Sequence, residues 1–301
     1  MKKSMIVVMV FAVIWALLST ASNITAQEQE TDPESVIRAI LGALDAGDAE
    51  TALSYIAEDA VIVLLPPALG GENNIMVGKE VIGDWWAFLA TDHSRTELWD
   101  FTVDGNKVTW KASLWGDYFE NIGMEAPLQA DGVGIVEDGL LQTYTWKASD
   151  ESIARLQAAE MRSANKEIVR RYLEAWEQAD LATLDELLAA DFINHSSPLP
   201  PDREGMMTFA TEHRNQFPTG EYTIQHLVAE DNLVFMYGRF QGTHDGEPFM
   251  DIPANGVEVD FAFSILFRLQ DGKLAERWGT ADDVMGMLIP LGFELVPPQS
   301  E

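Results

Sequence analysis

The sequence contains no cysteine, which excludes disulfide bonds, a lipid-attachment cysteine and any metal site built on thiolates. Packing must therefore supply the stability of the fold. Basic residues are also scarce, since 19 Lys and Arg stand against 49 Asp and Glu and give a formal net charge of −30. A surface of this charge repels nucleic acid and anionic lipid, so we expect neither as a partner.

Common signatures of catalysis and cofactor binding are missing as well. The chain has no Gly-rich phosphate-binding loop and no Gly-x-Ser-x-Gly nucleophile motif. Its five histidines lack a compact ligand spacing such as His-Glu-x-x-His, so we expect no metal site. The hydrophobic content of 47% nevertheless indicates a globular protein.

The N-terminus has the composition of a secretory signal peptide. Lys2 and Lys3 form a short basic region, residues 5–18 are apolar, and small and polar residues follow up to Ala26. The apolar run of about 14 residues is shorter than the roughly 20 residues that a membrane-spanning helix needs. We therefore expect residues 1–26 to be a signal peptide that is cleaved after Ala21 or Ala26. The protein would then be exported, periplasmic or secreted, and free of the membrane; an uncleaved anchor is the alternative.

An internal repeat divides the rest of the chain. Residues 37–62 align without gaps on residues 169–194, at an offset of 132 residues. The identical pairs are Arg38/Arg170, Leu41/Leu173, Ala43/Ala175, Asp48/Asp180, Thr51/Thr183, Ala57/Ala189 and Asp59/Asp191. A period of this length is too long for a solenoid repeat and indicates a duplicated domain. The chain after the signal peptide is also the right length for two domains.

Each copy has the same predicted order of elements. The first helices begin at N-caps Asp32 and Asn165 and carry apolar residues at helical spacing. The next two helices are predicted at 49–56 and 81–89 in the first copy, and at 181–188 and 204–213 in the second. Strands are predicted at 98–103, 108–115, 132–136 and 140–146, and then at 222–228, 233–241, 257–269 and 273–278. Helices followed by an antiparallel meander indicate an α+β fold, and residues 149–164 form a helical linker.

The second copy carries a set of short motifs in a fixed order. They are NKEIVRRYLEAW at 165–176, DFINH at 191–195, REG at 203–205, FP at 217–218, GTHDG at 242–246 and DGKLAERW at 271–278. This set resembles the SnoaL-like polyketide (ester) cyclases. The first copy resembles the wider nuclear transport factor 2-like superfamily more loosely, through its first helices and GKEVI at 78–82. The expected domains are thus nuclear transport factor 2-like at 33–148 and SnoaL-like at 165–293.

The resemblance implies two cone-shaped α+β barrel domains, each with three helices packed on a curved, mostly antiparallel sheet. It implies an aromatic-lined pocket for a small hydrophobic molecule, and copies that can pair as an internal pseudo-dimer. It also implies a His and an Asp deep in the cone that catalyse an intramolecular aldol closure without a cofactor. In our alignment these two positions hold Ile265 and Gly279, which argues against the same mechanism.

Other polar residues near the expected mouth of the second cone are candidates for the site. The candidate catalytic residues are His195, His244 and Asp282, and the candidate substrate-binding residues are His213, Arg239, Glu276, Arg277 and Trp278. His195 would act as a base at the mouth or simply fix a turn. Arg239 and Arg277 would orient a carboxylate or carbonyl, or instead form ion pairs with Asp260 or Glu276.

Two functions are therefore open. The first is an exported protein that binds a small hydrophobic molecule and carries out cyclase- or isomerase-type proton transfer through His195, His244 and Asp282. The alternative is a non-catalytic binding or protein-interaction module with a degenerate cyclase site. The residues at 265 and 279 favour the second function, and the retained histidines favour the first. The catalytic hypothesis requires its three residues to point into one cavity.

Overall fold

The computed structural model of the chain describes residues 32–66, 74–282 and 284–294. The expected signal peptide at 1–26 lies outside these residues. Among the described residues, no helix is both long enough and apolar enough to cross a membrane. They divide into two compact units, called here the first domain (residues 32–120 and 125–153) and the second domain (121–124 and 154 onward). Each combines helices with one sheet, which confirms the expected α+β fold.

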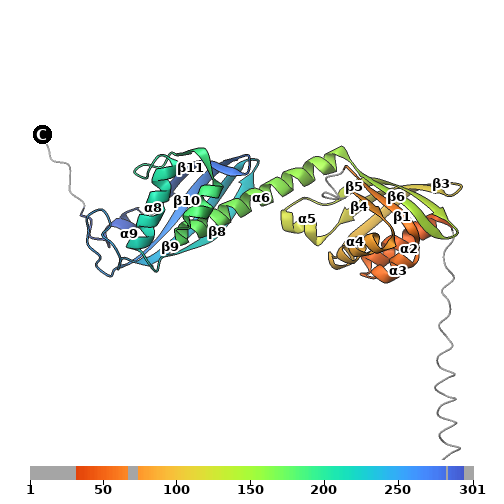
Figure 1. The fold of residues 1–301 in the computed structure, drawn as a ribbon, viewed down its shortest axis with the longest axis horizontal. Helices are drawn as coiled ribbons and strands as arrows, with labels where there is room; N and C mark the ends of the chain where they lie inside the picture. The colour runs from red at the N-terminus through yellow and green to blue at the C-terminus, as the bar shows by residue number, and fades with distance from the viewer. Residues whose placement is uncertain (1–31, 67–73, 283, 295–301) are drawn as a thin grey trace, which may run out of the picture. The chain divides into compact units, whose positions relative to one another are not determined.

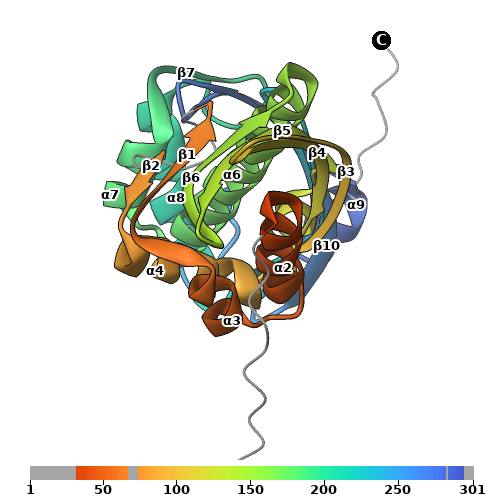
Figure 2. The same cartoon turned by 90° about the vertical axis from the view of Figure 1, so that its right-hand side faces the viewer.

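The first domain contains helices α2 (Pro33–Asp45), α3 (Ala49–Ser54), α4 (Lys79–Thr91) and α5 (Asp117–Ile122). Its strands are β1 (Ile56–Leu65), β2 (Ile75–Val77), β3 (Arg95–Asp104), β4 (Lys107–Trp115), β5 (Leu128–Glu137) and β6 (Leu140–Ala148). They form one sheet in the order β2-β1-β6-β5-β4-β3. Only the β1–β6 pair among these strands is parallel. Figure 2 shows α2 lying inside the curve of β3, β4 and β5.

The second domain contains most of α6 (Asp150–Gln178), then α7 (Leu181–Leu187), α8 (Arg203–Gln216) and α9 (Val284–Leu288). Its strands are β7 (Leu188–Asn194), β8 (Glu221–Glu230), β9 (Leu233–Thr243), β10 (Glu258–Gln270) and β11 (Lys273–Ala281). They form a sheet in the order β7-β11-β10-β9-β8, in which β7 is parallel to β11 and the other pairs are antiparallel. Figure 1 shows α8 lying across the strands of this sheet.

Both domains share one strand order, because β1-β6-β5-β4-β3 corresponds to β7-β11-β10-β9-β8. The sequence analysis missed β1 and β7 as strands. Each follows its helix with almost no turn residues between them, so no turn in the sequence marks the start of a strand. Each then pairs in parallel with the last strand of its own domain.

The start of the first helix is correct in one copy and wrong in the other. Asp32 caps α2 by accepting a hydrogen bond of 3.1 Å from the backbone N–H of Ser35, with Pro33 next to it. No helix begins at Asn165, because α6 runs from Asp150 through it without a break. Residues 150–165 contain no Gly or Pro and are rich in strong helix formers. The Asn165 side chain instead donates to the Asp231 carbonyl at 3.1 Å.

The sheet of the second domain has an inner face, packed on its helices, and an outer face. On β10, the buried residues Phe263, Ile265 and Phe267 alternate with the more exposed Ser264 and Leu266. The inward residues join apolar side chains of α6, α7 and α8 in one core. Burial of each large apolar side chain contributes about 1.5–3 kcal/mol to folding. The polar residues that share this inner face are therefore the ones to examine for function.

Candidate functional site

A chain of three polar side chains crosses the interior of the second domain. Trp176 on α6 donates a hydrogen bond from Nε1 to the Tyr222 hydroxyl at 3.2 Å. The same hydroxyl lies 3.2 Å from Nε2 of His213 on α8. An indole N–H can only donate, so the tyrosine accepts from Trp176 and has its own proton left for His213. The direction of the chain is therefore Trp176 to Tyr222 to His213, with a neutral imidazole at its end.

Aromatic rings enclose this imidazole. The rings of Phe209, Phe217, Tyr222 and Phe240 surround His213 at centroid distances between 5.1 and 6.1 Å. Burial, with a smaller contribution from the charge of Arg214, lowers the pKa of His213 to about 4. Burial also raises the pKa of Tyr222. Both groups are therefore uncharged at neutral pH.

Arg277 on β11 brings a positive charge to the same inner face. Its Nη1 donates to Asn194 Oδ1 at 3.1 Å and to Ser196 Oγ at 3.2 Å. The Tyr172 hydroxyl also hydrogen-bonds to this guanidinium, whose charge partly offsets the rise that burial causes in the pKa of Tyr172. All three partners are neutral.

Arg277 has no counterion among the residues that the structure describes. Its exposed fraction is 8%, and among the described residues no carboxylate forms an ion pair with it. Its Nε is buried, and no described residue accepts a hydrogen bond from it. Removing a charge from water without a counterion costs several kcal/mol. The expected alternative of an ion pair with Glu276 does not form, because adjacent residues on a strand point to opposite faces.

The two positions that the resemblance assigns to catalysis are neighbours on this face. Ile265 on β10 pairs in register with Gly279 on β11. A Cβ built on Gly279 would lie 2.9 Å from Nη2 of Arg277 and 3.1 Å from its Nη1 and Cζ. The guanidinium therefore lies against the place where a side chain at position 279 would begin.

His195, Glu276 and Trp278 form a separate cluster on the outer face. His195 Nε2 lies 2.7 Å from a Glu276 carboxylate oxygen, and its ring stacks on Trp278 with centroids 4.6 Å apart. The hydrogen bond from His195 and the one from Arg268 lower the pKa of Glu276. Trp278 is 37% exposed. Glu276 and Trp278, expected to contact substrate inside the cone, thus point away from it.

The remaining candidates are dispersed. His244 is fully buried beside Phe217, and its Nε2 lies 3.1 Å from the Glu247 carbonyl, to which it donates. Asp282 accepts a hydrogen bond of 2.8 Å from Ser264, an outer-face residue. His195, His244 and Asp282 therefore do not point into one cavity, contrary to what the catalytic hypothesis requires.

Arg239 also lies on the outer face, where it forms the alternative ion pair that the sequence suggested. Its Nε lies 2.5 Å from an Asp260 carboxylate oxygen, and both side chains are largely exposed. Of the substrate-binding candidates, only His213 and Arg277 thus lie on the inner face. Within the described residues, no three His, Asp or Glu side chains are grouped so that they could hold a metal ion.

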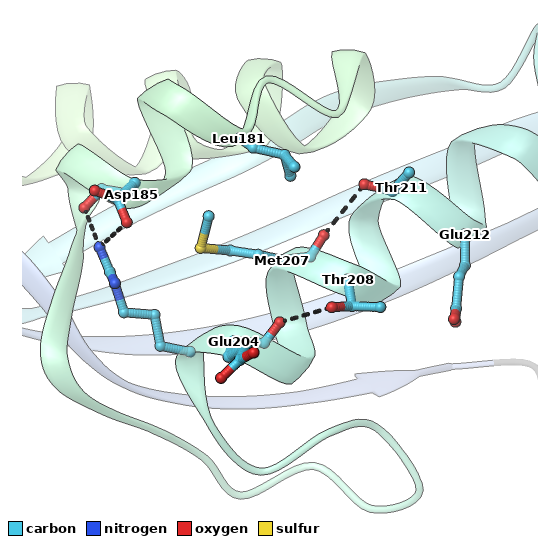
Figure 3. Close-up of a pocket in the computed structure, with 8 residues that line it drawn as sticks. Leu181, Asp185, Glu204, Met207, Thr208, Thr211 and Glu212 are labelled. Carbon is cyan, nitrogen blue, oxygen red and sulfur yellow. Dashed lines mark hydrogen bonds and ion pairs between the residues drawn. The ribbon is translucent and has the colours of Figure 1, made fainter.

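A surface groove of about 510 Å³ lies between α7 and α8. Figure 3 shows Leu181 and Asp185 facing Met207, Thr208 and Thr211 across it. Arg203, which also lines the groove, donates a hydrogen bond to Asp185. The groove residues of α8 lie on the side of the helix opposite His213, as their spacing along it requires. The groove is therefore separate from the aromatic interior.

The first domain has an aromatic inner face of its own. Trp110 packs between Phe101 and Tyr144, with ring centroids 6.1 and 5.5 Å away. Gly132 pairs in register with Trp110 and with Trp146, and the indole of Trp110 lies over it. Trp110, Tyr144 and Trp146 are buried and belong to the core of this domain.

Sequence reasoning missed the inner-face partners of His213 and Arg277. Trp176 and Tyr172 fall on the apolar face of a predicted helix, and Tyr222 begins a predicted strand. The pattern therefore predicts all three as core residues. Their polar tips were the available signal, because buried Tyr and Trp side chains usually find a hydrogen-bond partner. Asn194 and Ser196 surround His195 in the sequence, but their side chains join Arg277 on the inner face.

Comparisons with known proteins agree with this description of the second domain. Residues 166–288 match the family of SnoaL-like polyketide cyclases, which confirms the resemblance for this part of the chain. Ile265 and Gly279 both lie inside the matched range. The match of the first domain to the wider superfamily stays a prediction, and a comparison with curated proteins gives no match.

Similar solved structures each cover less than half of this chain. IdmH from Streptomyces antibioticus is 29% identical, with 43% of this chain and 99% of that protein covered and a TM-score of 0.38. TsrD from Streptomyces laurentii is 23% identical, with coverages of 44% and 96% and a TM-score of 0.40. AclR from Streptomyces galilaeus is 22% identical, with coverages of 45% and 86% and a TM-score of 0.41.

Proposed function

We propose that the protein binds a small hydrophobic molecule on the inner face of its second domain, without the aldol closure of the related cyclases. The observation that carries this proposal is the Trp176–Tyr222–His213 chain inside an aromatic shell, in a domain that has Ile265 and Gly279 at the two positions that the resemblance assigns to catalysis. Binding sites for small molecules are typically apolar and aromatic with a few placed polar groups. The inner face has that composition.

A catalytic version of this function would need a different set of residues from the one expected. His195 and Asp282 bond to outer-face residues, so neither can transfer a proton at the inner face. His213 is the one histidine bonded into the polar chain, and with a pKa of about 4 it is a weak base. Binding without turnover is therefore the function that the geometry supports best.

The test is a binding measurement on the full chain with 2-acetylnaphthalene, a hydrophobic carbonyl compound, by native mass spectrometry and calorimetry. We expect His213→Ala to weaken binding by about tenfold, the effect of one lost buried hydrogen bond. The matched control is His195→Ala, a histidine on the outer face, which should bind as the wild type does. Phe240→Trp, which overfills the aromatic shell, should also reduce binding.

Three results would contradict the proposal. Wild-type protein that binds no hydrophobic carbonyl compound would favour the interaction-module alternative. Equal weakening by His195→Ala would place the ligand on the outer face. Conversion of the bound compound by the wild type would restore the enzymatic alternative and require new catalytic residues.

Two further parts of this proposal concern the whole chain. Residues 1–26 carry the basic, apolar and small-residue order of a signal peptide, which supports export. Mass spectrometry of the N-terminus of the protein made in a secreting bacterial host should find a start after Ala21 or Ala26. The strand order common to both sheets supports an origin by domain duplication.

A further inference from the structure

We propose that the molecule bound by the second domain carries a carboxylate, which pairs with the guanidinium of Arg277. This inference rests on the proposed function, since it names the chemistry of the ligand at the same inner face. It starts from a buried positive charge on that face, around which the described residues place only neutral groups.

Every element around Arg277 contributes a neutral side chain. Tyr172 comes from α6, Asn194 is its neighbour in register on β7, and Phe267 is its neighbour in register on β10. Folded proteins pair buried charges with a charge of opposite sign. No described residue does so here. A ligand that brings the negative charge would complete the site.

Two hydrogen-bond donors of this cluster lack acceptors within the described residues. One is the buried Nε of Arg277. The other is the hydroxyl of Ser196, whose oxygen accepts from Arg277 Nη1 at 3.2 Å and from the Gly279 backbone N–H at 2.5 Å. With both hydrogen bonds directed at the oxygen, the hydroxyl proton is available to an acceptor. A carboxylate suits this set because it accepts from a guanidinium and from a further donor at the same time.

Gly279 explains why the counterion must come from outside. The start of a side chain at this position would lie 2.9 Å from Nη2 of Arg277, so a carboxylate there would form an internal ion pair. Glycine removes that possibility and leaves the guanidinium with only neutral hydrogen-bond partners among the described residues. Ile265, directly across the strand pair, supplies no charge either.

The surroundings also restrict the rest of the ligand. The aromatic rings of Tyr172 and Phe267 pack together with centroids 5.2 Å apart, and Phe267 is the register partner of Arg277, so the carboxylate must be attached to an apolar body. The net charge of −30 repels ligands with several negative charges over long distances. The class that fits is an aromatic or alicyclic monocarboxylate.

The test compares two ligands of the same shape, 2-naphthoate and its neutral amide, on the full chain by calorimetry at pH 7. Wild-type protein should bind the carboxylate at least about tenfold more tightly, as expected for hydrogen bonds to a charged group. Arg277→Gln should remove this preference. Gly279→Asp should remove it too, because the introduced carboxylate occupies the guanidinium, while Gly279→Asn, of equal size and neutral, should keep it.

The outcomes separate this inference from the proposed function. Equal affinity of the wild type for the acid and the amide would overturn the inference and leave the proposed function standing. Binding of neither naphthalene compound nor 2-acetylnaphthalene would overturn both. The two Gly279 variants retain Arg277, so their comparison is decisive even where Arg277→Gln does not fold. A preference that survives Gly279→Asp would contradict the pairing with Arg277.

Discussion

Ile265 and Gly279 lie directly opposite each other across the β10–β11 pair, on the inner face of the second domain. These are the two positions at which the related cyclases are expected to hold a catalytic His and Asp. Their adjacency explains how such a pair could cooperate across two strands. In this chain both are replaced, and the space beside position 279 is taken by the guanidinium of Arg277. The departure from the family therefore concerns one connected region, with consequences for charge as well as catalysis.

Restoring an acid at position 279 should stabilise the fold. In Gly279→Asp the introduced carboxylate pairs with Arg277, whereas Gly279→Asn adds the same volume without charge. We expect the Asp variant to exceed the Asn variant in free energy of unfolding by about 1–3 kcal/mol at pH 7. Pairing lowers the folded-state pKa of that carboxyl below about 3.9, so the advantage should be lost as the pH falls through this lowered pKa.

Denaturant titrations of both variants at pH 7 and pH 3 measure this difference. Thermal unfolding of the wild type serves as the reference, since any side chain at position 279 must also push the guanidinium aside. Equal stabilities of the two variants at pH 7 would show that Arg277 already has a counterion.

The hydroxyl of Tyr222 should contribute more to the stability of the fold than the hydroxyl of a tyrosine on the outer face. Tyr222→Phe leaves the Trp176 indole N–H and the His213 imidazole without their common partner. We expect a loss of about 1–3 kcal/mol in the free energy of unfolding, as is typical for buried polar groups left unsatisfied. The matched control is Tyr237→Phe on the same sheet, which should change stability by less than about 0.5 kcal/mol.

Urea unfolding monitored by tryptophan fluorescence gives both values. Comparable losses in the two variants would mean that the polar chain contributes nothing beyond ordinary packing.

The fold could be predicted from the sequence to a large extent, and the site to a small one. Helical spacing, the Asp32 cap and the turn pairs identified most elements because these signals are local. β1 and β7 were not predicted because each follows the preceding helix almost without a turn. Asn165 was predicted as an N-cap, but it lies within α6 and its side chain bonds to the carbonyl of Asp231. The site depends on which face of a strand a residue occupies.

That dependence decides which of the candidate side chains reach the inner face. Arg277 lies between Glu276 and Trp278, and strand alternation sends it to the inner face and both neighbours to the outer one. Register with β10 and contact with α6 then determine its surroundings. The contact with α6 is not readable without the tertiary structure, since it joins residues about 100 positions apart in the chain.

The imidazole of His213 should titrate at a pH well below the usual range for histidine. NMR of the imidazole Cε1–H should give a midpoint near pH 4, assigned through the loss of the signal in His213→Gln. Because the folded state disfavours the charged imidazole, the stability contributed by the neutral form is complete above pH 6.5 and lost as the pH falls toward 4. The total loss is on the order of 2–3 kcal/mol.

The stability of His213→Gln should accordingly vary less than that of the wild type between pH 6.5 and pH 4. A midpoint for His213 close to 6.5 would show that the aromatic shell is open to water in solution.

Substitution by alanine should lower the stability of the first domain at one glycine and raise it at another. Gly132→Ala places a methyl group 2.1 Å from Cε2 of the buried Trp110, which Phe101 and Tyr144 hold on either side. Overpacking of this kind costs about 1–3 kcal/mol or more. Gly42 lies on the exposed side of α2, with nothing within 4 Å of an added Cβ, so Gly42→Ala should stabilise by about 0.5–1 kcal/mol.

Differential scanning calorimetry of the full chain can assign both effects to the first domain. The transition that moves down in Gly132→Ala should be the one that moves up in Gly42→Ala, while the transition that shifts in Tyr222→Phe stays in place. An unchanged melting temperature in Gly132→Ala would show that the indole of Trp110 can move away from position 132 at no cost in stability. The inner face of the first domain would then be adaptable enough to admit a ligand of its own, which the close packing of Trp110 against Gly132 argues against.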